Sequence, residues 1–399
     1  MGMLKKFDER LDYTLLFILL LFFIVSIFSL NKAHELGLTD RNYAYQQAIF
    51  YGLSLIPFTV ILFINKEVFK KTAPFIYLLA LLLLAGILIP SKITPVINGA
   101  KGWYQIGGAE NGVGGVSIQP AELMKIGLIM GLAWVLHKHR YRKSIFNEIY
   151  LLIKLTILFA PVAYIIIQFP DLGSLISLFA IFLSMIFVSK IRLFTMMTFV
   201  FSLPAAGIGT LMYLYFKDEH YFFNEIVMKL PDYMQKRFYG WLKPDEYYSE
   251  AGFQLQQSLI SIGSGKLTGM PITDYIPPVP YVYSESIFIV IGFSTGFIGS
   301  VFVILLYFLL LYRIVTNCIE IQDPFGKYIG TGVAGLITYQ VFQNIGMSIG
   351  LLPITGLGLP FISYGGSSLI AFMICIALIL NFKIYEEKYM FSGEKEVEG

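Results

Sequence analysis

Four ionisable residues lie within or beside apolar runs of this chain, where charge is costly and usually has a function. They are Glu122 and Lys125 in QPAELMK, Asp171 in FPDLGS, and Glu285 in YVYSESIF. A carboxylate in such a place can act as a general base, and a nearby cation can lower its pKa or bind an anionic group. These residues are therefore the first candidates for chemistry.

Each candidate also has an ordinary structural explanation. Lys125 lies roughly 9 Å inside a helix that begins at Pro120. Glu122 shares its face at i, i+3, so the two can form a local pair of roughly 0.2–0.5 kcal/mol. Asp171 and Glu285 each stand at the expected start of a helix, where a carboxylate favours the helix dipole. Spacing leaves both explanations open for Lys125 and Glu285, and it favours the helix-terminal role for Asp171.

The elements that position these residues are membrane-spanning helices. Of the 399 residues, 56% are hydrophobic and only 14% are charged, which excludes a soluble globular domain. The net charge of +3 gives no indication of nucleic-acid binding. The apolar runs predict an all-α polytopic membrane protein with about ten transmembrane helices. The expected spans are about 11–30, 45–64, 73–90, 120–136, 149–168, 172–188, 193–215, 285–312, 328–349 and 360–382.

Short loops between most of these spans predict a single transmembrane domain over residues 1–383, followed by a charged cytoplasmic tail over 384–399. The first span is too long for a signal-peptide core, so we expect it to be retained. Lysines and arginines are concentrated in the short loops on one side, such as 137–148. This asymmetry puts both termini in the cytoplasm and the long segment 217–284 outside.

Cysteines and histidines give no sign of a disulfide framework or a metal site. Cys318 and Cys375 fall at a helix end and within the last span. The four histidines lie in loops or at helix ends, and no Ser/His/Asp arrangement is evident.

Residues 352–369, LPITGLGLPFISYGGSSL, are the most informative stretch, because prolines and glycines there interrupt two apolar runs. Irregular backbone at membrane depth is tolerated only where it is buried in protein or lines a wet cavity. A tight turn between two helices would explain the pattern. The whole string, however, closely resembles the last turn and final helix of the SEDS family (shape, elongation, division and sporulation), polytopic glycosyltransferases of bacterial cell-wall synthesis.

Other motifs resemble the same family in the same order, over nearly the whole chain up to Lys383. QPAELMK is similar to the signature at the outer end of the family's fourth helix, NGAKGW to its NGARRW loop, and FPDLGS to its QPDLG segment. In the long outer loop, Arg237 with the following WLKP resembles the family's arginine segment. GFQLQQS at 252–258 resembles the GYQ-x-x-QS motif.

The segment PYVYSESIF at 280–288 resembles the family pattern P-E-x-H-T-D-F-I-F, whose aspartate is the proposed catalytic base. Glu285 takes the aspartate position with a side chain one methylene longer. Tyr283 replaces the histidine, and Tyr281 replaces the preceding acid. Base catalysis tolerates such a change only if the donor–acceptor distance returns to about 2.6–3.2 Å.

The resemblance implies a peptidoglycan glycosyltransferase that polymerises lipid II on the outer face of the bacterial cytoplasmic membrane. Glu285 would be the general base, and Lys125 would orient it and lower its pKa. The candidate substrate-binding residues are Lys101, Glu122, Asp171, Arg237, Gln254, Gln257 and Ser258. No cofactor is required by the sequence, although a divalent cation could help to bind the pyrophosphate. The implied partners are lipid II and a class B penicillin-binding protein, which is a transpeptidase.

Two other functions use the same features. A lipid II flippase needs a polar groove and cations but no base. A catalytically silent scaffold for the transpeptidase would explain the altered motif around Glu285. The sequence leaves open whether the chain serves elongation, division or sporulation.

Overall fold

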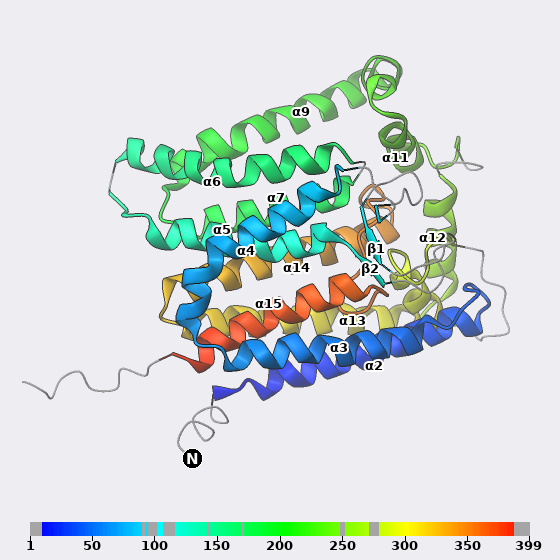
Figure 1. The fold of residues 1–399 in the computed structure, drawn as a ribbon. Coiled ribbons are helices and arrows are strands. Elements are labelled where there is room, and N and C mark those ends of the chain that lie inside the picture. Colours follow the sequence, from blue (N-terminus) through cyan, green and yellow to red (C-terminus); the bar gives the residue numbers. More distant parts are fainter. Residues whose placement is uncertain are drawn as a thin grey trace, which may run out of the picture.

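The computed structural model describes residues 10–89, 93–94, 102–106, 116–142, 144–169, 171–247, 252–270 and 279–386. Long helices lying side by side make up the bundle (Figure 1). Those of the first half are α2 (Tyr13–Glu35), α3 (Tyr43–Phe63), α4 (Lys66–Gly86), α5 (Pro120–Lys138), α6 (Ile145–Ile167) and α7 (Leu172–Phe187). A helical series follows through α8 (Leu193–Met196), the π-helix η1 (Met197–Phe201) and α9 (Ser202–Lys217). The last bundle helices are α13 (Ile287–Glu320), α14 (Pro324–Ser348) and α15 (Gly366–Ile384).

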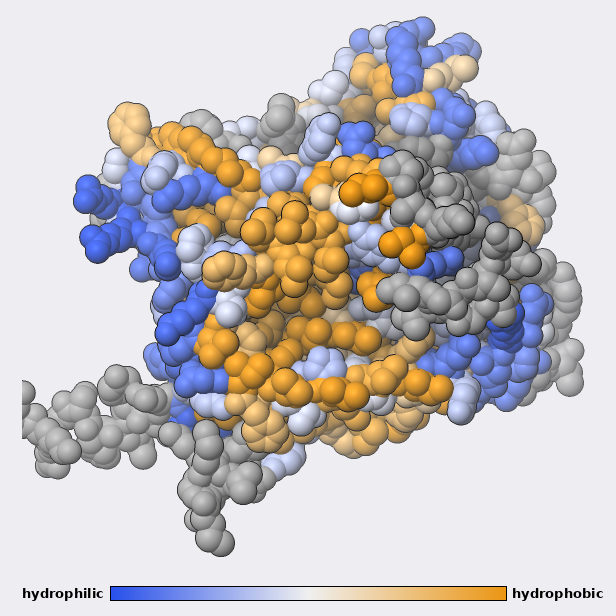
Figure 2. Space-filling model, in the orientation of Figure 1, coloured by the Kyte–Doolittle hydropathy of each residue, from blue (hydrophilic) through white to orange (hydrophobic). Residues whose placement is uncertain are grey.

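The surface of the bundle matches a lipid environment. Within the described residues, 7 helices are long and apolar enough to cross a membrane, and α7 is a shorter apolar helix. The 23 residues of α2 rise about 35 Å, which exceeds the roughly 30 Å of a bilayer's hydrocarbon core. Figure 2 shows apolar side chains gathered across the middle of one face, with hydrophilic residues toward both ends. The predicted all-α polytopic membrane fold is confirmed.

Several helices begin at a side chain that caps their first free N–H groups. Each of these caps accepts a hydrogen bond from a backbone N–H in the first turn. The capping residues are Asp12, Asn42, Asn65, Asp171 and Asp323. In addition, α5 and α14 carry proline at their first position, where no N–H is needed. The local sequence therefore sets these helix starts.

The two largest errors among the expected helix starts are at α4 and α15. Helix α4 begins at Lys66, not near 73. The last helix begins at Gly366, not near 360, because Phe361 takes a φ of 65° and the chain continues as a turn to Gly365. The eighth span begins at Ile287, close to the expected 285, and Ser286 is its cap. Glu285 therefore precedes the helix and does not belong to its first turn.

The core of the bundle lies around α5 and α15, which are largely buried, whereas α3 and α4 expose most of their surface. Helix α15 packs against α3, α5, α13 and α14, and α5 packs against α4, α7 and α14. Most of the buried apolar side chains belong to one continuous cluster. The candidate residues on α5 are thus placed in the interior of the protein.

The segment between α9 and α13 lies at the end of the bundle opposite to the start of α2 and the end of α15 (Figure 1). We name this the α12 end, and the opposite one the terminal end. The segment between α9 and α13 consists of α10 (Glu219–Tyr221), η2 (Phe222–Ile226), the 3-10 helix η3 (Val227–Lys229), α11 (Asp232–Leu242) and α12 (Phe253–Ser264). The antiparallel strands β1 (Tyr104–Ile106) and β2 (Val116–Ile118) lie at the same end. This arrangement agrees with termini on one side and the long segment on the other, but which end faces the cytoplasm stays a prediction. Most of the expected tail lies outside the described residues.

Candidate active site

Glu285 lies at the α12 end and is contacted from two sides. Gln254 of α12 donates a hydrogen bond from Nε2 to Glu285 Oε1 at 3.1 Å, and its Nε2 also lies 3.3 Å from Ser286 Oγ. The second carboxylate oxygen faces the turn formed by residues 349–365. A Cβ placed on Gly356 of this turn would lie 2.9 Å from Glu285 Oε2. The carboxylate is thus held between α12 and the 349–365 turn.

The surroundings of Glu285 make it a stronger base than an ordinary glutamate. Burial raises the pKa of its carboxyl above the usual 4.5, and the Gln254 hydrogen bond and the Arg237 charge counteract this only in part. The pKa of Glu285 is therefore raised and not lowered, and the role expected for Lys125 in lowering it stays a prediction. The shift has the opposite direction because burial dominates, and Arg237 on α11 is the cation whose charge acts on the acid. A carboxylate with a raised pKa is better matched to base catalysis near neutral pH.

Lys125 is paired within its own helix. Its Nζ donates to Glu122 Oε1 at 2.6 Å, and the two side chains are only 1% and 6% exposed. The same Nζ lies 5.9 Å from the ring centre of Phe372 on α15. This is the local pair that spacing had left open, and it counts against a direct contact with Glu285. Catalytic and substrate-binding roles for Lys125 and Glu122 stay predictions.

Asp171 caps α7, so the helix-terminal role is confirmed. Its Oδ1 accepts from the Ser174 backbone N–H at 3.0 Å, and its Oδ2 accepts from Ser174 Oγ at 2.6 Å. Gln119, directly before α5, donates from Nε2 to the same Oδ2 at 3.5 Å. Asp171 therefore also links the starts of α5 and α7, while its contact with a substrate stays a prediction.

The other predicted binding residues are divided between α11 and α12. Ser258 is buried and donates from Oγ to the Gln254 carbonyl at 2.6 Å, so it braces the helical turn that carries Gln254. Gln257 is buried in the same helix, and Arg237 on α11 is partly exposed. The structure brings Gln254 and Arg237 to Glu285, and substrate contacts by these residues stay predictions. Lys101 lies outside the described residues.

Three tyrosines from separate segments gather beside the acid. The rings of Tyr43 and Tyr283 are stacked with centres 4.4 Å apart, and Tyr364 lies 4.7 Å from Tyr43. Tyr364 also donates from its hydroxyl to Gln46 Oε1 at 2.8 Å. Tyr283 is two residues before Glu285 and interacts electrostatically with it, so the cluster lies beside the segment that carries the acid.

The irregular 349–365 turn accepts many hydrogen bonds from the helices around it. Side chains of the bundle donate to its backbone carbonyls, as irregular backbone at membrane depth requires. The donor and carbonyl pairs are Gln343 with Pro353, Asn344 with Leu357, Tyr307 with Pro360, Tyr51 with Phe361, Ser26 with Ile362 and Gln47 with Ser363. At its start, Trp241 of α11 donates from Nε1 to the Gly350 carbonyl at 3.0 Å. The turn is therefore a fixed part of the site.

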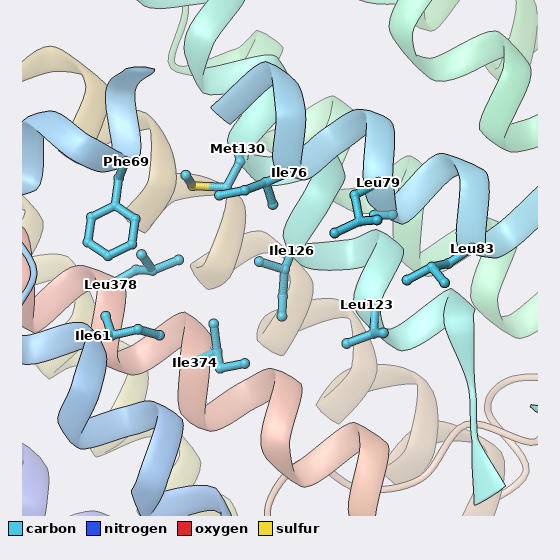
Figure 3. A pocket seen from close by; sticks show the side chains of 11 residues that line it. Ile61, Phe69, Ile76, Leu79, Leu83, Leu123, Ile126, Met130, Ile374 and Leu378 are labelled. Carbon is cyan, nitrogen blue, oxygen red and sulfur yellow. The ribbon is translucent and has the colours of Figure 1, made fainter. Parts of the chain in front are cut away.

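An apolar groove opens on another face of the bundle. It has a volume of about 250 Å³ and lies between α3, α4, α5 and α15 (Figure 3). Its lining residues are Ile61, Phe69, Ile76, Leu79, Ala80, Leu83, Leu123, Ile126, Met130, Ile374 and Leu378. Leu83 and Leu123 mark the end toward β1, since Tyr104 of that strand donates from its hydroxyl to the Leu83 carbonyl at 2.8 Å. The groove runs toward the terminal end, where α3 finishes and α4 begins.

Metal ligands do not gather anywhere in the described part of the chain. No group of three or more His, Cys, Asp or Glu side chains there could hold a metal ion. A divalent cation that binds together with a pyrophosphate stays a prediction.

Sequence reasoning did not identify three residues that lie against the acid or against the backbone of residues 284–285. They are Gly356, Asn344 on α14, and Ser363 in the 349–365 turn. A signal for Asn344 was present, because Gln340, Gln343 and Asn344 place three amides on one side of an otherwise apolar span. The contact partners themselves depend on tertiary packing.

Fold and site together define a polytopic membrane protein that presents a partly buried acid at one end of its bundle. The chain belongs to the cell cycle protein family that groups FtsW, RodA and SpoVE, whose model matches residues 9–388. This confirms the predicted SEDS membership.

Two relatives and one solved structure describe the similarity. Stage V sporulation protein E of Bacillus subtilis is 31% identical over 86% of this chain and 87% of its own. The probable peptidoglycan glycosyltransferase FtsW of Geobacter metallireducens is 30% identical over 89% and 88%. A solved structure on the coordination of polymerization and crosslinking by a peptidoglycan synthase complex matches with a TM-score of 0.74. That match has 25% identity and covers 94% of this chain and 99% of the other.

Proposed function

We propose that this protein is a peptidoglycan glycosyltransferase that polymerises lipid II, with Glu285 as the general base. The observation that carries the proposal is the state of Glu285, a partly buried acid with a raised pKa, held by Gln254 and placed near the positive charge of Arg237. A flippase or a scaffold has no need of such a base. The name of the FtsW relative from Geobacter metallireducens agrees with this activity.

The reaction would form a β-1,4 bond from an α-linked donor and therefore invert the anomeric carbon. Glu285 would take the proton from the 4-hydroxyl of the acceptor GlcNAc while that oxygen attacks the MurNAc anomeric carbon. The bond from this carbon to the pyrophosphate oxygen breaks, and undecaprenyl pyrophosphate leaves. Arg237 is suited to the developing negative charge, since a guanidinium binds phosphate oxygens in two-pronged geometry.

The apolar groove suits one section of the isoprenoid tail of such a substrate. Its lining is entirely aliphatic and aromatic apart from backbone, and one end lies near β1 at the α12 end. A tail in the groove would leave the pyrophosphate and sugars at the same end of the bundle as Glu285. The expected class B penicillin-binding protein would then crosslink the product strand.

The proposal is tested with purified protein, fluorescent lipid II and detection of polymer by gel, with and without a transpeptidase partner. Glycan strands made by the wild-type chain support it. Transport of lipid II across liposomes without polymer would indicate the flippase. If no polymer forms either with or without the partner, but the chain makes the partner transpeptidase active, the chain is a scaffold.

The α12 end must face the outside for this function. In a variant without Cys318 and Cys375, a cysteine at Tyr247 should react with an impermeant thiol reagent in intact cells. A cysteine at Tyr141, near the terminal end, should react only after lysis. Labelling of position 141 in intact cells would overturn the orientation and remove the outer-leaflet substrate.

A further inference from the structure

Three successive backbone carbonyls hold the segment that carries the acid. The Tyr283 carbonyl accepts from the Tyr364 backbone N–H at 2.9 Å. The Ser284 carbonyl accepts from Ser363 Oγ at 2.6 Å. The Glu285 carbonyl accepts from Asn344 Nδ2 at 2.7 Å. All three donors come from α14 or from the 349–365 turn, far away in the sequence.

Asn344 and Ser363 also hold the turn itself. The second amide proton of Asn344 is donated to the Leu357 carbonyl at 2.7 Å, and Ser363 Oγ accepts from the Leu359 backbone N–H at 2.6 Å. Asn344 is completely buried. Both side chains therefore join the acid-bearing segment to the turn whose Gly356 lies against the carboxylate.

We propose that Asn344 and Ser363 are positioning residues for Glu285. They fix the backbone of residues 283–285 relative to the 349–365 turn, and so set the direction in which the carboxylate points. The inference rests on the proposed function, since it assigns these residues to the reaction of Glu285. Positioning of this kind matters because a misplacement of about 1 Å can cost about 10²-fold in rate.

A purely structural explanation is that Asn344 satisfies two buried carbonyls and nothing more. The chain contains a matched control for this alternative. Asn381 on α15 is also completely buried, and its Nδ2 donates to the Ile61 carbonyl at 2.7 Å and to the Ile64 carbonyl at 2.6 Å. It makes the same two bonds as Asn344, but near the terminal end, where α3 finishes.

The kinetic experiment compares Asn344→Ala, Ser363→Ala and Asn381→Ala as purified full-length proteins in lipid II polymerisation. We expect Asn344→Ala and Ser363→Ala to lower kcat by at least about tenfold and to change KM by less than about twofold. Asn381→Ala should keep both within about twofold at a temperature where all variants are folded. Equal losses of kcat in Asn344→Ala and Asn381→Ala would show a structural role and overturn the proposal, as would a change in KM alone.

A second readout is independent of activity. Hydrogen exchange of the backbone amides at 284–289 should be at least about tenfold faster in Asn344→Ala than in wild type, and unchanged in Asn381→Ala. Unchanged exchange in Asn344→Ala would overturn the proposal. If the wild-type chain does not polymerise lipid II, the proposed function fails. Faster exchange confined to residues 284–289 in Asn344→Ala would then show that Asn344 fixes this segment of the backbone. The role of Asn344 in positioning a catalytic base would nevertheless fail together with the proposed function.

Discussion

Removal of one partner from the buried Glu122–Lys125 pair separates a structural from a catalytic role of Lys125. The substitution Lys125→Met keeps the length and apolar contacts of the stem but leaves the Glu122 charge alone in the core. Glu122→Gln leaves the Lys125 charge alone instead. The double substitution removes both charges and keeps the approximate volume of both side chains.

The structure sets the magnitude. A pair at this spacing on an exposed helix contributes roughly 0.2–0.5 kcal/mol. Here the side chains are only 1% and 6% exposed, the two atoms are 2.6 Å apart, and Glu122 Oε2 has no hydrogen-bond partner in the described part of the chain. Each single substitution should therefore cost about 3–5 kcal/mol, whereas the double substitution should be nearly neutral. Burial thus makes the expected loss of stability about ten times larger than the value that spacing alone predicts for an exposed pair.

Denaturant unfolding in detergent measures the stabilities, and lipid II polymerisation measures the activity of the same samples. We expect the double variant to recover both the stability and most of the activity that Lys125→Met loses. Recovery of stability without activity would refute the structural account. Lys125 or Glu122 would then act directly in the reaction, and their pairing would be only one of their states.

Three further predictions concern Glu285 and its surroundings. Gly356→Ala should lower kcat at least about tenfold, because its φ is 78° and the new Cβ would lie 2.9 Å from Glu285 Oε2. Gly350→Ala is the control, with a φ of 79° and no contact closer than 3.5 Å; it should lose stability but keep its kcat, and equal kcat losses would contradict the contact. The rate should fall on acidification through the raised pKa of Glu285, because the base acts only when deprotonated. Arg237→Gln removes a charge that lowers this pKa, so the acid limb of the plot of kcat/KM against pH should shift to higher pH. An acid limb at the wild-type pH would contradict the assignment of Glu285 as the base.

The fold could be predicted from composition because hydrocarbon imposes the strongest constraint on such a chain. Each of the ten expected spans coincides with a helix or a helical series in the described residues. The largest errors are at α4, whose first turns carry Lys66, Glu67, Lys70 and Lys71, and at α15, which follows the left-handed residue Phe361. Hydropathy registers neither charged first turns of a helix nor backbone dihedrals, so the starts of α4 and α15 could not be placed from apolar runs.

The site was predictable only in part, because side-chain partners are set by packing. The resemblance pointed to Glu285, Gln254 and Arg237, which the structure brings together. Spacing could not decide between the two possible partners of Lys125. The link from Asn344 to Glu285 crosses 59 positions of the chain and depends on how α14 meets the turn before α13.

The central claim is that Glu285 is the base of a polymerisation reaction, and Glu285→Gln tests it most directly. This variant keeps the size of the side chain and its contact with Gln254 but cannot accept the proton. Polymerisation by the purified protein should fall by at least about 10²–10⁴-fold, the range typical of general-base loss. Glu285→Asp, one methylene shorter in surroundings fitted to glutamate, should polymerise less well than wild type. Polymerisation by Glu285→Gln at the wild-type rate would contradict the account.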